Sequence, residues 1–251
     1  MVDVIMKRYA IITHVRREDG YAGGVPKWTW YLKRAISEAG HEVQHFTWAD
    51  YPRPDDLKEL AGPSEAAMGF ALSAWVGREA HQYRWIVADG FWGSGLPDDA
   101  PAIIVAHGLW AGYQAAIGGV PEPYLAAQAA VYRRFPVIAV SQSAANDLQA
   151  YHQVRASAVV PNGVDLELYK PDGHARGRLI RHACLGRAKG GDTVERIARS
   201  LNGAARVEYL DAAIGCEPGR FAAADACLHP SRYEGDSIAC IEALACGVPL
   251  I

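Results

Sequence analysis

The stretch YAIITHVRREDGYAGGVPKWTWYLKRAISEAGHEVQHF (residues 9–46) decides the fold class. It begins with an apolar run at residues 9–13 that is typical of a buried strand, and a glycine-bearing loop follows. Over residues 27–39 the apolar side chains recur at spacings of three and four, which indicates a helix that Gly40 is suited to end. The alternating segment 41–46 predicts a second strand. Strand, helix and strand in this order predict a parallel βαβ unit.

The same alternation continues along the rest of the chain. We predict further strands at residues 85–88, 102–106, 137–140, 183–185, 207–210, 226–228 and 248–251, and helices at residues 65–80, 123–134, 141–151, 193–201, 218–224 and 237–245. The pattern predicts an α/β protein with doubly wound parallel sheets. We expect two domains, at residues 1–163 and 164–251, with a hinge near residues 161–171.

Composition excludes several classes of function. The chain has 251 residues, a formal net charge of −3, and no apolar run near the roughly 20 residues that a membrane span needs. We therefore expect no nonspecific nucleic-acid binding and no transmembrane segment. The five cysteines include no C-x-x-C pair, which favours a reduced, cytoplasmic setting. Peripheral contact with a membrane stays open.

The sharpest local motif is SRYEGDSIACIEALACG (residues 231–247). Asp236 or Ser237 is suited to cap a helix that Gly247 ends. Every residue from 238 to 246 is apolar except Glu242, so this carboxylate should be buried, where it needs strong hydrogen-bond donors. Glu234 stands just before the same helix.

The start of this helix is suited to bind phosphate. The backbone N–H groups of Gly235, Asp236 and Ser237 lie at the positive end of the helix dipole. Five residues of helix place Glu242 about 7.5 Å along the axis from Ser237. One ligand with a diphosphate and a hydroxylated ring could therefore contact both ends. The alternative is a capped, buried helix with a structural glutamate.

The spacing of Glu234 and Glu242, E-x7-E, resembles the signature of retaining GT-B glycosyltransferases, in particular glycosyltransferase family 4. Three more segments match that family in the right order: GGVPKWTWYLKRAISEAGHEV (residues 23–43), VVPNGVDLELYKP (159–171) and LGRAKGGD (185–192). The resemblance implies a GT-B fold of two Rossmann-like domains, with an acceptor-side first domain and a nucleotide-sugar-binding second domain. The second domain is shorter than usual in the family, which fits either a minimal form or a fragment.

The resemblance also implies roles for the donor-side residues. Arg187 and Lys189 match the basic pair that neutralises the donor phosphates, although the family usually spaces the pair more widely. Glu234 matches a catalytic glutamate near the hydroxyls of the donor sugar. Residues 235–237 match its phosphate-binding helix start, and Glu242 is expected at the ribose. Gly23 and Gly24 are expected to approach the donor diphosphate or the acceptor. Without the family context, basic loop residues are ordinarily solvated surface and adjacent glycines ordinarily mark turns.

On the acceptor side, His107 follows a predicted strand and matches a family histidine near the reacting sugar, so we expect it to be catalytic. Asp89 ends the preceding strand and is an alternative group to meet the acceptor. Trp92 and Trp110 stand in loops at strand ends, where acceptors bind in open α/β sheets. The competing interpretation of each is structural: a core histidine, or ordinary aromatic packing.

These features together predict a retaining hexosyltransferase. The donor would be a UDP- or GDP-linked sugar, and the acceptor a hydroxyl of a saccharide, a lipid-linked compound or a small molecule. We expect no obligatory metal or other cofactor, because Arg187, Lys189 and backbone amides would neutralise the phosphates and no Asp-x-Asp motif occurs. The absence of G-x-G-x-x-G disfavours a nicotinamide enzyme. The alternatives are a nucleotide-sugar-binding protein or fragment without transfer activity and, with a poorer fit, an epimerase or phosphorylase.

Overall fold

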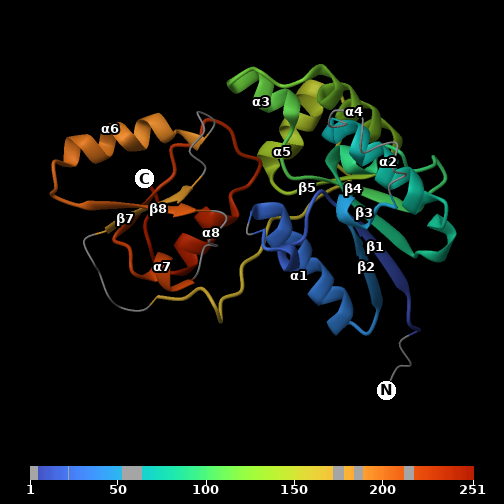
Figure 1. The fold of residues 1–251 in the computed structure, drawn as a ribbon, viewed down its shortest axis with the longest axis horizontal. Coiled ribbons are helices and arrows are strands. Elements are labelled where there is room, and N and C mark those ends of the chain that lie inside the picture. Colours follow the sequence, from blue (N-terminus) through green and yellow to red (C-terminus); the bar gives the residue numbers. More distant parts are fainter. Residues whose placement is uncertain (1–4, 22, 53–63, 172–177, 184–188, 212–217) are drawn as a thin grey trace.

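The computed structural model describes residues 5–21, 23–52, 64–171, 178–183, 189–211 and 218–251. In this part the chain forms two parallel sheets flanked by helices, and Figure 1 shows them as two lobes with α1 at their boundary. The strands are β1 (Arg8–Ile12), β2 (Glu42–Phe46), β3 (Trp85–Asp89), β4 (Ala102–Ala106), β5 (Val137–Ala139), β6 (Ala158–Val159), β7 (Arg178–Ala183), β8 (Arg206–Asp211) and β9 (Ala226–Leu228). The α/β prediction with two parallel-sheet domains is confirmed.

Helices connect the strands. They are α1 (Gly24–Glu38), α2 (Glu65–Gly77), α3 (Trp110–Ala116), α4 (Glu122–Arg134), α5 (Gln142–Asp147), α6 (Gly191–Leu201), α7 (Pro218–Ala222) and α8 (Ile238–Ala245). The short helical turns are η1 (Arg17–Asp19), η2 (Trp48–Asp50), η4 (Ala80–Gln82), η5 (Gly90–Gly93) and the π-helical η6 (Leu148–His152). The helix predicted at residues 141–151 is thus α5 continued by a π turn.

The first sheet has the strand order β2-β1-β3-β4-β5-β6, and every neighbouring pair is parallel. Several of its apolar strand residues are fully buried, among them Ile11, Ile12, Ile86 and Ile104. Because all the strands point the same way, their carboxyl ends meet at one edge of the sheet, and the loops that follow β1, β3 and β4 share that edge.

The second sheet has the order β8-β7-β9, again parallel. The predicted strand at residues 248–251 runs beside β9: the Cys227 N–H donates to the Pro249 carbonyl at 2.9 Å, and the Ile251 N–H donates to the Cys227 carbonyl at 2.9 Å. Phe221 of α7 and Ala243 of α8 are fully buried in the core beneath it.

One strand was predicted only in part. We predicted residues 183–185, but β7 covers Arg178–Ala183, and Cys184 and Leu185 lie outside the described residues. The error has a physical reason, because β7 is the middle strand and its backbone pairs with both β8 and β9. Such pairing stabilises a strand in spite of the arginines and histidine in RLIRHA, which interrupt the apolar pattern.

Candidate functional site

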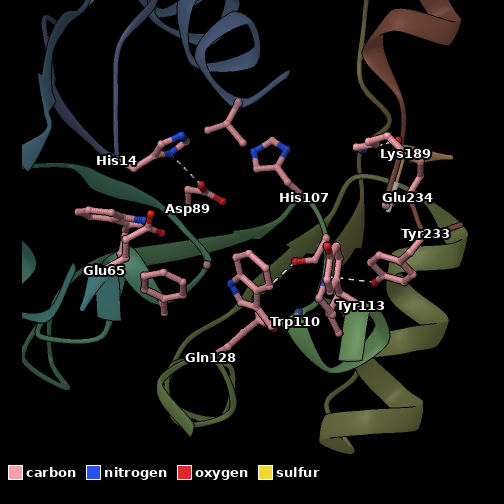
Figure 2. A pocket seen from close by; sticks show the side chains of 17 residues that line it. His14, Glu65, Asp89, His107, Trp110, Tyr113, Gln128, Lys189, Tyr233 and Glu234 are labelled. Carbon is pink, nitrogen blue, oxygen red and sulfur yellow. Dashed lines mark hydrogen bonds and ion pairs between the residues drawn. The ribbon is translucent and has the colours of Figure 1, made fainter. Parts of the chain in front are cut away.

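A cavity of about 470 Å³ lies where the loops of the two lobes meet. From the first lobe it is lined by residues that follow β1, β3 and β4, and from the second by Lys189 and the loop 233–235 (Figure 2). Its lining includes several residues that the sequence singled out, namely Asp89, Trp92, His107, Trp110, Lys189, Glu234 and Gly235. The fold therefore brings together the predicted acceptor-side and donor-side residues.

The two lobes touch closely at Gly235. A Cβ atom on this glycine would lie 1.7 Å from the carbonyl oxygen of His107 and 3.1 Å from the Cα of Gly108. Both are backbone atoms, which cannot move aside as a flexible side chain can. Glycine is therefore required for the loop of Glu234 to reach the loop of His107.

Tyr233 makes a second contact between the lobes. Its hydroxyl accepts a hydrogen bond from the Leu109 N–H at 3.1 Å and donates to Asp147 Oδ2 at 2.9 Å. The ring lies against Gly112, where a Cβ would be 2.5 Å from the ring atoms. This tyrosine thus fixes the position of Glu234, its neighbour in sequence, over the first lobe.

Asp236 adds a third contact: the Asn162 N–H donates to its carboxylate at 3.1 Å, and the Asn162 side-chain amide donates to its carbonyl at 3.3 Å. The contact joins the start of α8 to the segment that follows β6. These two hydrogen bonds therefore hold the segment after β6 against the start of α8, close to the cavities.

Glu234 lies between two cations. Its carboxylate pairs with Lys189 Nζ and lies 3.3 Å from His229 Nε2 (Figure 2 shows the pair with Lys189). Burial would raise the pKa of Glu234, but the interactions with His229 and Lys189 outweigh burial and lower it to about 2. Cys240 and Glu234 raise the pKa of His229 to about 9. At neutral pH the site therefore holds an ionised carboxylate beside two positive charges.

His107 lies at the end of β4, with its ring 4.6 Å from the Trp28 ring in an edge-on arrangement. Burial lowers the pKa of His107 to about 3, and His14 adds to the effect. Its Nε2 is buried and has no hydrogen-bond partner among the described residues. The neutral imidazole is thus available to form a hydrogen bond with a ligand hydroxyl. A histidine that acts as a general acid at neutral pH would need a higher pKa.

Asp89 ends β3 and points into the same cavity, with His14 Nδ1 at 3.9 Å from its Oδ2 (Figure 2). Burial raises the pKa of Asp89 to about 7, and burial also lowers the pKa of His14. His14 lies two residues after the end of β1. Its position after a predicted strand was the signal that the sequence interpretation missed.

The aromatic residues of the cavity differ in exposure. Trp92 is only 4% exposed and packs on Phe91, with the ring centroids 5.9 Å apart. Trp110 is half-buried and meets Tyr113 edge-on, with the centroids 5.8 Å apart. Its backbone N–H donates to the buried Gln128 side chain at 2.7 Å, which fixes the loop after β4. Trp110 is therefore the tryptophan of this wall with more surface to offer a ligand.

A smaller cavity of about 90 Å³ lies at the start of α8 and is lined by Gly24, Lys27, Lys189, Glu234, Asp236, Ser237, Ile238 and Ala239. Gly24 begins α1, and a Cβ on it would lie 3.8 Å from the Ile238 side chain, so the first turns of α1 and α8 are neighbours. Gly23 occupies the cap position of α1. Ser237 occupies the cap position of α8, but its side chain makes no capping hydrogen bond.

Sequence comparison assigns the chain to a family. The sequence model described as Glycosyltransferase Family 4 matches residues 22–168, more than half of the chain. The chain belongs to glycosyltransferase family 4. No curated protein matches the sequence.

Solved glycosyltransferase structures share the fold. Sucrose-phosphate synthase from Thermosynechococcus elongatus has a TM-score of 0.75 and 18% identity, over 97% of this chain and 80% of that one. WaaG, a glycosyltransferase involved in lipopolysaccharide biosynthesis, has a TM-score of 0.70 and 16% identity, over 96% and 80%. Anabaena Alr3699/HepE in complex with UDP and glucose has a TM-score of 0.64 and 19% identity, over 97% and 80%. The predicted GT-B fold agrees with these neighbours, and the chain spans about 80% of the length of each.

In this family 4 glycosyltransferase, Glu242 is fully buried in α8, as the apolar helix predicted. Its Oε1 lies 2.5 Å from Nζ of Lys27, which is 5% exposed. Ligand hydroxyls or buried amides were the predicted partners, whereas the structure places a lysine there. Lys27 stands just after Gly23 and Gly24. No local pattern could predict its pairing with Glu242, because the two residues are 215 positions apart in the chain.

Arg187 lies outside the described residues. Among the described residues, no group of three or more histidine, cysteine, aspartate or glutamate side chains is arranged to hold a metal ion. In the same part of the chain, no helix is both long and apolar enough to cross a membrane.

The raised pKa of Asp89 gives a prediction for this glycosyltransferase. Its folded value of about 7 is above the ordinary 3.8, so the folded state binds the proton more tightly and loses stability as the pH rises from about 4 to above 7. We expect Asp89→Asn to stabilise the protein by about 1–2 kcal/mol at pH 8, with a difference that shrinks toward pH 4. Urea unfolding at both pH values measures the effect. The exposed Asp99→Asn is the control, and an equal effect of Asp89→Asn at pH 4 and pH 8 contradicts the prediction.

Proposed function

We propose that this chain is a retaining hexosyltransferase that moves a sugar from a nucleotide-diphosphate sugar to an acceptor hydroxyl. The observation that carries the proposal is the cavity of about 470 Å³ in which His107 of one lobe faces Lys189 and Glu234 of the other. Residues 1–163 would form the acceptor-side domain and residues 164–251 the donor-side domain. Family membership supports the reaction class.

The donor would lie across the start of α8. Its diphosphate would be bound by the backbone of residues 235–237 and by Lys189. Asp236, Ser237 and Lys189 line the small cavity beside α8. Glu234 would accept hydrogen bonds from hydroxyls of the donor sugar, and Glu242 from the ribose. Arg187 remains a candidate for a second phosphate contact. The phosphate charge would thus be met by protein groups, without an obligatory metal or other cofactor.

The acceptor would enter from the aromatic side of the larger cavity. Trp110 and Tyr113 offer flat apolar surface there, and Asp89 and neutral His107 offer hydrogen bonds to hydroxyl groups. This lining suits the face and hydroxyls of a sugar ring or a similar small molecule.

The reaction would proceed on one face of the sugar. The acceptor oxygen would form a bond with the anomeric carbon as the bond from that carbon to the diphosphate breaks, and the acceptor proton would pass to the departing phosphate oxygen. The anomeric configuration is then kept. Glu234 is held by Lys189 and His229, which favours a binding role over that of a covalent nucleophile.

The test is nucleotide release from UDP- and GDP-linked hexoses, with and without saccharide acceptors. UDP-glucose is the first donor, because a solved structural neighbour is described in complex with UDP and glucose. We expect acceptor-dependent release that His107→Ala reduces by about tenfold, the cost of one lost hydrogen bond of about 1.4 kcal/mol. The exposed His81→Ala is the control. Binding of UDP or GDP without any release would instead support a nucleotide-sugar-binding protein.

A further inference from the structure

Lys27 is a buried cation at the junction of the two lobes. It lies in the first turn of α1 in the first lobe and is 5% exposed. Its ammonium donates to Glu242 Oε1 of α8 at 2.5 Å and lies 3.5 Å from the hydroxyl of the buried Tyr169. The pair therefore joins two helices from opposite lobes through side chains that are both buried.

The hydrogen bonding of this buried ion pair is incomplete. Burying two charges loses their hydration, and the mutual attraction compensates only when the remaining polar atoms also find partners. Glu242 Oε2 is buried and has no hydrogen-bond partner among the described residues. Burial raises the pKa of Glu242, although Lys27 and a hydrogen bond from Tyr169 oppose the shift. Oε2 is thus able to accept a hydrogen bond that none of the described residues supplies.

Lys27 also lines the small cavity beside the start of α8, together with Lys189. Each lysine pairs with one glutamate of the E-x7-E motif: Lys189 with Glu234, and Lys27 with Glu242. The first turns of α1 and α8 meet at the same cavity and add the positive ends of two helix dipoles. Two ammonium groups and two helix ends around one cavity are suited to a ligand with more than one negative charge.

We propose that Lys27 binds the donor diphosphate, and that it exchanges Glu242 for a phosphate oxygen when the nucleotide sugar enters. Ribose hydroxyls then donate to Glu242 and take the place of the lysine, so neither charge is left unpaired. Lys27 supplies a cation from the first lobe to a ligand that is otherwise bound by the second. Donor binding thereby holds the two lobes together over the reacting sugar. The proposal rests on the proposed function, since it requires a nucleotide-diphosphate ligand.

The experiment must separate phosphate binding from simple neutralisation of Glu242. We therefore compare Glu242→Gln with Glu242→Gln/Lys27→Met, because with a neutral glutamine at 242 the lysine has no carboxylate to neutralise. Calorimetry measures the Kd of UDP, GDP and ADP. The Kd of the matching nucleoside, such as uridine, is measured as well, because the nucleoside carries no phosphate. Thermal melts confirm that both proteins are folded.

We expect the added Lys27→Met change to weaken binding of the preferred nucleoside diphosphate by about tenfold and to leave the nucleoside within threefold. In the same background, Lys27→Arg should bind the diphosphate within threefold of the lysine protein. Lys33→Met is the matched control, because Lys33 lies on the same helix but pairs with Glu18 at the surface.

Two outcomes would contradict the role of Lys27, and a third would contradict the proposed function. An unchanged diphosphate affinity in the double variant shows that Lys27 serves only to neutralise Glu242, and overturns the inference alone. An equal loss for diphosphate and nucleoside assigns Lys27 a structural role and does the same. Failure of the wild-type protein to bind any of the three diphosphates overturns the proposed function, and the inference with it.

Discussion

Glu234→Gln should lower kcat for sugar transfer by about 10²–10³-fold, the usual cost of removing a charged group that acts on the transition state. The substitution preserves the size of the side chain but removes the charge that Lys189 and His229 face. Because the pKa of Glu234 is lowered to about 2, the carboxylate is ionised throughout the physiological range, and glutamine cannot imitate it.

Steady-state kinetics with a nucleotide-linked hexose measure this effect, and UDP or GDP affinity is measured beside it. The nucleotide Kd should change by less than about threefold, since Glu234 is assigned to the sugar and residues 235–237 to the phosphates. Glu195→Gln, on the exposed face of α6, should have no effect on either quantity. A kcat within threefold of wild type would remove Glu234 from the catalytic site.

Gly235→Ala should cost about 1–3 kcal/mol of stability, typical of an overpacked contact, and about 10²-fold in kcat/KM. A Cβ at 1.7 Å from the His107 carbonyl oxygen must push the two loops apart. The displaced loop carries Glu234 away from His107, and a misplacement near 1 Å is enough for a loss of that size.

Chemical denaturation and kinetics at a temperature where the variant is folded separate the two effects. Gly219→Ala is the matched control, because a Cβ there meets no atom within 4 Å. Normal activity in Gly235→Ala would show that the lobes do not need this contact during turnover.

Local sequence pattern predicted most of the elements because each depends on residues near one another in the chain. The helix at α1, for example, follows from the spacing of Trp28, Tyr31 and Leu32, and β4 from a continuous apolar run. β7 was predicted too late in the chain because its stability comes from pairing with β8 and β9, which no local pattern records.

The candidate site was predictable in part. Asp89 and His107 follow buried strands, and parallel strands deliver such residues to one edge of the sheet. Gln128 and Tyr233 were missed as positioning residues, since their hydrogen bonds to the loop of residues 108–110 exist only after folding. The roles of the site residues in binding and catalysis remain predictions.

The sequence by itself predicted that Glu242 is buried, because it is the one polar residue in an otherwise apolar helix segment. Only the tertiary structure decided what meets this carboxylate. Lys27 is 215 residues away in the chain and reaches it because the first turns of α1 and α8 come together between the lobes. The periodicity of apolar residues predicts whether a residue is buried. Which residue it contacts depends on how segments far apart in the chain pack against each other, and that packing involves the whole fold.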